Sequence, residues 1–174
     1  MKVTSLKIPE VKLLEPDVFE DERGHFFESF NQKEFNELVG PGIKFVQDNQ
    51  SSSKKGVLRG LHFQESPYEQ GKLIKVISGK VYDVALDLRN NSETFGRWLS
   101  IVLSANNKGQ LWIPPGFAHG FLALEENTEI SYKVTNFYNK NYEKNIPYNS
   151  KEFNIEWPEL EHNFILSKKD SQFV

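Results

Sequence analysis

The chain has 174 residues, no cysteine and a formal net charge of −3 at pH 7. A chain of this length can bury a core of its own without disulfide or metal staples, so we expect a single domain over residues 1–174. The lack of cysteine excludes disulfides, thiolate nucleophiles and cysteine-based metal sites, and the acidic balance excludes a general nucleic-acid binder, which carries a basic stripe on a basic domain.

The sequence also carries no pattern typical of export or membrane insertion. Its first ten residues lack the continuous apolar core of a signal peptide, and no later apolar run approaches the ~20 residues that a membrane helix needs. A cysteine-free chain suits a reducing compartment. We therefore expect a cytoplasmic protein with no membrane or nucleic-acid partner.

Most basic residues are lysines, and arginine occurs at only four positions. Arginine presents a planar fork that binds phosphate through two hydrogen bonds, whereas lysine is a flexible point charge. Arg23 and Arg59 lie in glycine-flanked, aromatic-rich segments and are candidates for binding a phosphate. Arg89 and Arg97 lie beside polar turn residues and are expected on the solvated surface.

One helix is predicted, near the amino terminus. Asn31 can cap its first turn, and Glu34 occupies the capping-box position three residues later. Phe35 and Leu38 fall on one face, and Gly-Pro-Gly at residues 40–42 ends the helix.

Most of the chain has the pattern of short strands separated by turn residues. Before the helix, residues 11–30 predict strand, turn and strand, ending in an extended aromatic run at residues 25–30. After the helix, strands are expected at residues 44–47, 57–64, 72–78, 80–88, 96–104, 110–113, 117–124 and 128–137. This pattern predicts an all-β fold, a double-sheet jelly roll with one short amino-terminal helix, and such folds hold ligands in the barrel mouth or interior.

The tail, residues 138–174, is polar. Trp157, followed by proline, is its expected docking point. No internal repeat, low-complexity tract or linker marks a second domain.

Several polar side chains lie in one strand-like stretch, Gly56-Val57-Leu58-Arg59-Gly60-Leu61-His62-Phe63-Gln64. Alternation places residues 58, 60, 62 and 64 on one face and residues 59, 61 and 63 on the other, so His62 is expected to point inward. A lone inward histidine is more often a core residue satisfied by one hydrogen bond than a functional group. A second histidine, His119, follows the tight Pro-Pro-Gly entry into another strand.

Two inward histidines on separate strands are compatible with a metal site or with proton transfer. Metal-binding cupins carry a second histidine two residues after the first, where this chain has Gln64, and no carboxylate is placed to complete a metal shell. We therefore predict no metal, although a metal cupin such as an oxygenase or isomerase remains an alternative.

Proton transfer suits histidine because its pKa lies near working pH. Tyr132 and Tyr138 are six residues apart and share a face if their strand is regular, so they offer a proton donor and a surface for stacking a base, although core aromatics have the same pattern. Nucleotide-hydride, kinase and serine-hydrolase motifs are missing from the sequence.

Together these motifs resemble the dTDP-4-dehydrorhamnose 3,5-epimerases, metal-free cupins of nucleotide-sugar metabolism. The resemblance covers nearly the whole chain. Its motifs are Asp21-Glu22-Arg23-Gly24 with Phe27-Glu28, Gln47-Asp48-Asn49, Gly56 to His62, Gln70-Gly71-Lys72, Asp83-Val84-Ala85, Ser92 to Gly96, Gly116 to Phe121, Tyr132-Lys133 and Leu166-Ser167-Lys168-Lys169-Asp170.

The resemblance implies a cupin fold and a role for each matching residue. His62 is implied as the general base, Asp170 as the carboxylate that orients it, and Tyr132 as the acid on the opposite face of the sugar. Lys72, near the enolate oxygen, and His119 are implied to line the pocket. The implied nucleotide-sugar contacts are Arg23, Glu28, Gln47, Asp48, Asn49, Arg59, Glu143 and Lys169, with Tyr138 stacking on thymine.

The resemblance further implies that the substrate is dTDP-4-keto-6-deoxyglucose, that C3 and C5 are inverted and that no cofactor is needed. It also implies a homodimer in which the amino-terminal segment reaches the partner's site. One departure is that Ile146-Pro147-Tyr148-Asn149-Ser150 replaces the family's Trp-Asp-Pro element. The alternatives are a C3-only or C5-only epimerase of a related nucleotide deoxysugar, and a sugar-nucleotide-binding cupin without turnover.

Overall fold

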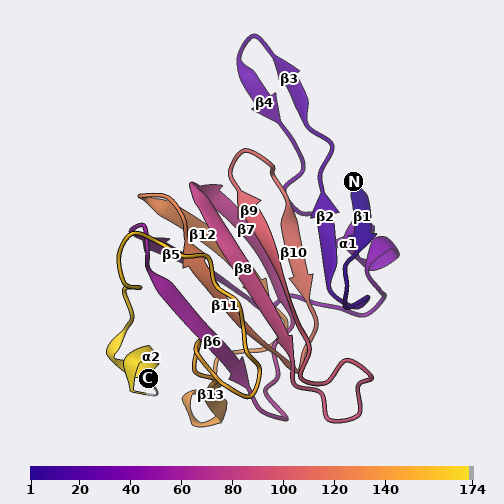
Figure 1. The fold of residues 1–174 in the computed structure, drawn as a ribbon. Helices are drawn as coiled ribbons and strands as arrows, with labels where there is room; N and C mark the ends of the chain where they lie inside the picture. The colour runs from indigo at the N-terminus through magenta and orange to yellow at the C-terminus, as the bar shows by residue number, and fades with distance from the viewer. Residues whose placement is uncertain (173–174) are drawn as a thin grey trace.

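The computed structural model describes residues 1–172, and two antiparallel sheets that pack face to face make up most of it (Figure 1). The six-stranded sheet has the order β1 (Lys2–Ser5), β2 (Lys12–Glu15), β10 (Gln110–Ile113), β7 (Lys72–Ser78), β12 (Thr128–Val134) and β5 (Gln47–Ser53). The five-stranded sheet has the order β13 (Glu143–Asn145), β6 (Leu58–Gln64), β11 (Phe117–Ala123), β8 (Lys80–Asp87) and β9 (Trp98–Ser104). The predicted all-β, double-sheet architecture is confirmed.

The other elements lie outside these two sheets. They are the hairpin β3 (Phe19–Asp21) and β4 (Gly24–Phe26), the helix α1 (Gln32–Leu38), the single 3-10 turn η1 (Lys140–Tyr142) and the helix α2 (Lys168–Ser171). The hairpin projects beyond the sheets, whereas α2 lies beside β6 (Figure 1).

The main core forms where the inward side chains of the two sheets meet. Ile74 on β7 and Leu111 and Ile113 on β10 pack with Ala85 on β8 and Phe117 on β11, and none of these five residues is more than 2% exposed. Alternation along each strand produces this layer, and burial of one large apolar side chain contributes about 1.5–3 kcal/mol. The layer therefore fixes the separation of the sheets that flank the candidate site.

The helix α1 covers the outer face of the six-stranded sheet, and the prediction of a helix capped by Asn31 with Phe35 on its packed face is confirmed, whereas Leu38 is exposed and Glu34 pairs with the amino terminus of Met1 at 3.0 Å. The Asn31 side chain accepts hydrogen bonds from the backbone N–H groups of Lys33 and Glu34, as an N-cap should. Phe35 is 2% exposed, and its ring centroid lies 5.3 Å from that of Trp112 in an edge-on contact.

The tail covers the outer face of the five-stranded sheet. Ile155 and Trp157 pack against a cluster that includes Val84 and Leu86 of β8, and Trp157 Nε1 donates to the carbonyl of Tyr148 at 2.9 Å. The predicted docking role of Trp157 is confirmed.

Several local predictions of secondary structure are wrong, and the strands β1 and β13 were not expected. The strand expected at residues 44–47 is β5, Gln47–Ser53, whose polar sequence becomes a strand because it pairs with β12 along its whole length. β12 ends at Val134 rather than at residue 137, and β4 covers only the first part of the aromatic run. The second helix, α2, was not expected because four residues give almost no periodic signal.

Arg89 corrects the expectation of a solvated side chain. Its Nε and Nη2 donate to the two carboxylate oxygens of Asp87 at 2.9 and 2.7 Å, and its guanidinium lies 4.7 Å from the centre of the Phe117 ring. This ion pair lowers the pKa of Asp87 well below its ordinary value. Arg97 is exposed, as expected.

Candidate active site

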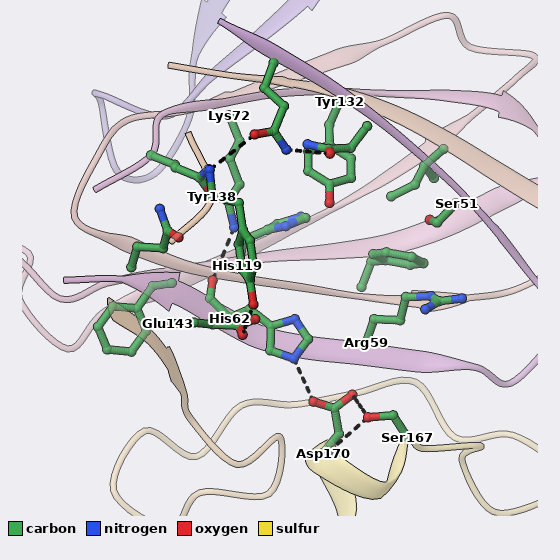
Figure 2. Close-up of a pocket in the computed structure, with 17 residues that line it drawn as sticks. Ser51, Arg59, His62, Lys72, His119, Tyr132, Tyr138, Glu143, Ser167 and Asp170 are labelled. Carbon is green, nitrogen blue, oxygen red and sulfur yellow. Dashed lines mark hydrogen bonds and ion pairs between the residues drawn. The ribbon is translucent and has the colours of Figure 1, made fainter. Parts of the chain in front are cut away.

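A cavity of about 430 Å³ lies between the two sheets, beside β5 and β6. The five-stranded sheet contributes Arg59, His62 and His119 to its wall, and the six-stranded sheet contributes Asn49, Lys72 and Tyr132. Figure 2 shows the side chains of His62, Lys72 and Tyr132 pointing into one space.

A β-bulge in β6 brings Arg59 and His62 to the same cavity. His62 pairs with His119 and Arg59 pairs with Phe121, so two residues of β6 lie opposite the single Gly120 of β11. Gly60 makes the bulge possible: its φ is +122°, and a Cβ there would lie 2.6 Å from Gly120 Cα. The predicted alternation, with Arg59 and His62 on opposite faces, is therefore wrong across this bulge.

His62 forms a hydrogen-bonded dyad with Asp170 of α2. The distance from His62 Nε2 to Asp170 Oδ1 is 2.7 Å, and the Asp170 side chain is only 3% exposed. An ionised carboxylate only accepts hydrogen bonds, so Nε2 carries the hydrogen and Nδ1 keeps the free lone pair. Burial lowers the pKa of His62, an effect that Asp170 opposes, so the imidazole is neutral and able to accept a proton at neutral pH.

Lys72 enters the cavity from β7 and is 8% exposed. Its ammonium donates to the backbone carbonyl of His62 at 3.2 Å. Burial lowers the pKa of Lys72 to about 8, against the opposing charges of Asp83 and Glu143. At neutral pH the site therefore holds a mostly charged ammonium in a poorly solvated place, where its field acts strongly on a neighbouring oxyanion.

Tyr132 lies opposite His62, on β12 of the other sheet (Figure 2). It pairs with Asn49 of β5 and Ile74 of β7, so strands on both sides fix its backbone. Burial raises the pKa of Tyr132, an effect that the Arg59 charge opposes, and the phenol stays protonated at neutral pH. The cavity thus has a proton acceptor on one wall and a proton donor on the other.

His119 is held by a carboxylate of its own. Its Nε2 lies 2.9 and 3.0 Å from the two oxygens of Asp83, which is fully buried on the neighbouring strand β8. His119 is 8% exposed and lines the cavity directly beside His62. The two histidines therefore have separate carboxylate partners, and their ring orientations are fixed independently.

A chain of polar contacts forms the rim of the cavity. The Tyr138 hydroxyl donates to Glu143 at 2.8 Å, and Glu143 forms an ion pair with Lys169 of α2 at 2.7 Å. Gln47 accepts from the backbone N–H of Tyr138 at 3.2 Å. The Tyr138 ring is about half exposed, so it presents a face at the entrance that can stack on a flat ligand.

Comparison with known sequences identifies the family of this chain. A sequence model of the dTDP-4-dehydrorhamnose 3,5-epimerase family matches residues 5–174. The chain belongs to this family. It is 56% identical over 170 residues to the dTDP-4-dehydrorhamnose 3,5-epimerase of Shigella flexneri, with 98% of this chain and 93% of the relative covered. It is therefore an epimerase, one of the isomerases.

Solved structures of the epimerase family share the fold. The dTDP-6-deoxy-D-glucose-3,5-epimerase of Legionella pneumophila, in complex with dTDP-4-keto-L-rhamnose, aligns with a TM-score of 0.94 and 47% identity over 98% of this chain and 90% of that one. A 3'-monoepimerase of Streptomyces bikiniensis, in complex with dTDP-quinovose, aligns with a TM-score of 0.89 and 29% identity over 96% of this chain and 84% of that one. The predicted cupin-type jelly roll is confirmed.

The cavity of this epimerase brings together most of the residues predicted for the site. The cavity wall contains Gln47, Asn49, Arg59, His62, Lys72, His119, Tyr132, Tyr138, Glu143 and Asp170. Both tyrosines line the cavity although the regular strand invoked for them ends before Tyr138. Lys169 lies at the rim through its pair with Glu143.

Three predicted contact residues lie away from this cavity. The Arg23 side chain is 90% exposed on the β3–β4 hairpin, where it pairs with Asp21, and Glu28 is also exposed just beyond the hairpin. Asp48 points out of β5, because it alternates with Gln47 and Asn49, and it pairs with Lys133 at 2.8 Å. Their roles as ligand contacts stay predictions.

Gln64 has a structural task in place of metal binding. Its side-chain amide donates to the carbonyls of Tyr68 and Phe137 at 2.6 and 3.2 Å and accepts from the backbone N–H of Asn139 at 2.6 Å. It thereby fixes the loop that carries Tyr138. Within residues 1–172 no group of three or more His, Asp or Glu residues is arranged to hold a metal ion. The same described residues contain no helix long and apolar enough to span a membrane.

The sequence predictions missed two serines in the cavity wall. The Ser51 hydroxyl is buried and has no hydrogen-bond partner among the described residues. Alternation from Gln47 and Asn49 would have placed it inward if β5 had been predicted correctly. Ser167 lies three residues before Asp170, which is the spacing of a helix N-cap.

The segment that replaces the family's Trp-Asp-Pro element is well anchored. Ile146 exchanges two backbone hydrogen bonds with Leu61, at 2.9 and 3.1 Å, and its side chain packs under the tail. The Tyr148 ring packs against Phe164, with centroids 5.6 Å apart. Apolar packing thus holds this segment beside the bulge of β6.

Proposed function

We propose that the protein inverts C3 and C5 of dTDP-4-dehydro-6-deoxy-D-glucose, forming dTDP-4-dehydro-L-rhamnose. The observation that carries this proposal is the placement of His62 and Tyr132 on facing sheets, with one cavity between them. An inversion at carbon requires a base on one face and an acid on the other. A protein that only binds the sugar nucleotide has no need for this arrangement.

The chemistry begins at the hydrogen next to the 4-keto group, which the carbonyl acidifies. His62 Nδ1 takes the proton from carbon, the C–H electron pair moves toward the carbonyl, and the oxygen becomes an enolate. The Lys72 ammonium stabilises that negative charge. Tyr132 then donates its proton to the opposite face of the carbon, and the bond re-forms with inverted configuration.

The same steps serve the second carbon after His62 has lost its proton and Tyr132 has regained one from solvent. Substrate and product have the same oxidation state, so the reaction needs no redox cofactor. The pKa of His62 is lowered and that of Tyr132 is raised, both chiefly by burial, so each group starts in the protonation state that its role requires.

We assign the diphosphate to Arg59 and the thymine to Tyr138. Arg59 uses Nε and one Nη2 hydrogen to contact Ser53 Oγ and the Ser52 carbonyl, at 3.1 and 3.0 Å, and keeps other N–H groups for a phosphate. The remaining proposed nucleotide-sugar contacts are Arg23, Glu28, Gln47, Asp48, Asn49, Glu143 and Lys169.

We further propose a homodimer in which the β3–β4 hairpin carries Arg23 to the partner's cavity. The hairpin extends away from its own chain's sheets (Figure 1) and exposes Phe19 and Phe26, which are 66% and 68% exposed and lie opposite each other. Exposed aromatic side chains of this kind are typical of interaction surfaces. Light scattering after size exclusion tests the dimer, and a monomer would contradict it. We place the enzyme in the cytoplasm, since a chain without cysteine suits a reducing compartment.

The decisive experiment is turnover of dTDP-4-keto-6-deoxyglucose in heavy water, followed by proton NMR. We expect deuterium at both C3 and C5 and a product with both centres inverted. Exchange and inversion at only one carbon would identify a monoepimerase, the activity named for the Streptomyces bikiniensis relative. Binding of the sugar nucleotide without any exchange would identify a non-catalytic protein.

A further inference from the structure

Both oxygens of the Asp170 carboxylate are occupied in hydrogen bonds. Oδ1 contacts His62 Nε2 at 2.7 Å, and Oδ2 accepts from the Ser167 hydroxyl at 2.8 Å (Figure 2). The Asp170 side chain is only 3% exposed, so these two contacts are its main means of solvating the charge. Its orientation, and therefore the orientation of the imidazole, depends on both contacts.

Ser167 has only one hydrogen to donate, and its surroundings decide where that hydrogen goes. Its Oγ also accepts from the backbone N–H of Asp170 at 3.1 Å, because Ser167 is the N-cap of α2. The backbone group must be the donor there, which leaves the O–H for Oδ2. A single conformation of the Ser167 side chain thus both caps α2 and donates to the Asp170 carboxylate.

We propose that Ser167 is a positioning residue for proton transfer: its hydroxyl fixes the Asp170 carboxylate, which in turn fixes the ring orientation and tautomer of His62. This inference rests on the proposed function, in which His62 is the base. Ser167 lines the cavity wall, but its described hydrogen bonds go to Asp170. It therefore acts through Asp170.

The segment around Ser167 is attached by contacts that do not involve its hydroxyl. Ile165 N donates to the Gly56 carbonyl at 2.8 Å, and Leu58 N donates to the Ile165 carbonyl at 3.1 Å. On the other side of Ser167, Lys169 pairs with Glu143. Removal of the hydroxyl is therefore expected to loosen the carboxylate while α2 stays beside β6.

The kinetic test compares Ser167→Ala, Ser167→Gly and Ser167→Thr with the control Ser171→Ala. Ser171 is exposed on the same helix, and its hydroxyl contacts only the Lys168 carbonyl among the described residues. Loss of a hydrogen bond to a charged group predicts about a tenfold to hundredfold lower kcat for the Ala and Gly variants, with KM changed less than about threefold. Glycine is a tolerated N-cap, so the Gly variant separates donation from capping. Thr should restore most of the rate, and Ser171→Ala should match the wild type.

A pH profile distinguishes positioning from a general loss of folded protein. The charged groups near His62 are Asp170 and Lys169 on α2, Lys72 on β7 and Glu143 on β13. Asp170 raises the pKa of His62, so a misaligned carboxylate should move the acid limb of kcat/KM to lower pH. An unchanged acid limb, with a loss equal to the unfolded fraction at every pH, would overturn the proposal.

Nitrogen-15 NMR of the imidazoles provides a readout without substrate. The wild type should show His62 with hydrogen on Nε2, and Ser167→Ala should show a mixture of tautomers, with His62→Asn used to assign the signals. A single Nε2–H tautomer in Ser167→Ala together with wild-type kcat would refute this inference alone. Absence of turnover by the wild type would instead refute the proposed function.

Discussion

The Lys72 ammonium donates a hydrogen bond to the backbone carbonyl of His62, with 3.2 Å between Nζ and O. Lys72, the cation proposed to stabilise the enolate, is therefore hydrogen-bonded to the backbone of His62, the base proposed to form it. Lys72 comes from β7 of one sheet and His62 from β6 of the other, so the contact joins the two sheets. A shift of one sheet relative to the other would therefore change the distance between the base and the cation.

The pH dependence of kcat/KM should be bell-shaped, with a basic limb near pH 8. Burial lowers the pKa of Lys72 to about 8, so the ammonium loses its proton as the pH rises through that value. The acid limb should lie below the ordinary His62 value of 6.5, because burial lowers that pKa. Initial rates between pH 5 and pH 10 test both limbs.

The variant Lys72→Arg provides the control for this assignment. A guanidinium stays charged across the range, so the fall near pH 8 should disappear even if the maximal rate is lower. A basic limb that stays at pH 8 in Lys72→Arg would assign it to another group.

Lys72→Met should abolish turnover and raise the unfolding temperature at pH 7. The folded-state pKa of about 8 lies below the ordinary value of 10.5, so the buried ammonium costs stability below about pH 8. That cost decreases as the pH rises from about 8 to 10.5, because the lysine is then neutral in the folded state. Thermal unfolding at pH 7 and pH 10 should therefore show a smaller difference between wild type and variant at pH 10.

Lys75→Met is the matched control on the same strand. Lys75 is only partly buried and lies outside the cavity wall, so this change should leave turnover intact. A lower unfolding temperature for Lys72→Met at pH 7 would contradict the view that function, rather than stability, requires this lysine.

Local signals in the sequence were enough to predict α1. Asn31 and Phe35 are close in the chain, and the capping by one and the packing of the other follow from short-range rules. β5 was misplaced because its polar residues become a strand only through pairing with β12, which is a tertiary effect. The bulge at Gly60 could not be predicted from local sequence either, since it depends on the approach of Gly120 from another strand.

The candidate site was predictable by residue type and family resemblance, but its arrangement was not. No periodicity in the sequence indicates that Asp170, 108 residues from His62, approaches it from a four-residue helix. The same holds for Asp83, whose partnership with His119 follows only from the pairing of β8 with β11.

Turnover should not depend on a metal ion. Gln64, which stands where metal-binding cupins have a second histidine, uses its amide to fix the loop that carries Tyr138. Treatment with chelators should leave kcat unchanged, and elemental analysis of active protein should find no stoichiometric transition metal. Activity that is lost on chelation and restored by one metal would overturn the proposed mechanism.

Arg23→Lys and Arg59→Lys should each weaken binding of dTDP while changing the unfolding temperature little. The charge survives, but lysine lacks the fork that grips a phosphate through two bonds. Arg89→Lys should show the opposite behaviour, because Arg89 holds the buried Asp87 and covers Phe117. We expect it to lose about 1–3 kcal/mol of stability with unchanged affinity.

Calorimetric titration with dTDP and thermal unfolding separate these cases, with Arg97→Lys as the exposed control. Unchanged affinity in both Arg23→Lys and Arg59→Lys would remove these residues from the binding site. If the hairpin serves a neighbouring subunit, a variant made monomeric should lose affinity to the same degree as Arg23→Lys.

His62→Ala and Tyr132→Phe should fail in different ways, because the two side chains act from opposite sheets. Loss of a general acid or base costs about 10²- to 10⁴-fold in rate. His62→Ala should therefore nearly abolish both inversion and exchange of the C3 and C5 hydrogens with heavy water, because no enolate forms. Tyr132→Phe keeps the base, so the enolate still forms and is reprotonated from the face that lost the hydrogen.

In Tyr132→Phe, deuterium should enter the sugar with retained configuration while inverted product falls sharply. Proton NMR of the sugar in heavy water measures deuterium content and stereochemistry in the same sample, and Tyr148→Phe, outside the cavity wall, is the control phenol. Near-normal inversion by Tyr132→Phe would transfer the acid role to Tyr138 or a water molecule. Normal turnover by His62→Ala would refute the mechanism, since the other histidine that lines the described cavity, His119, is already held by Asp83.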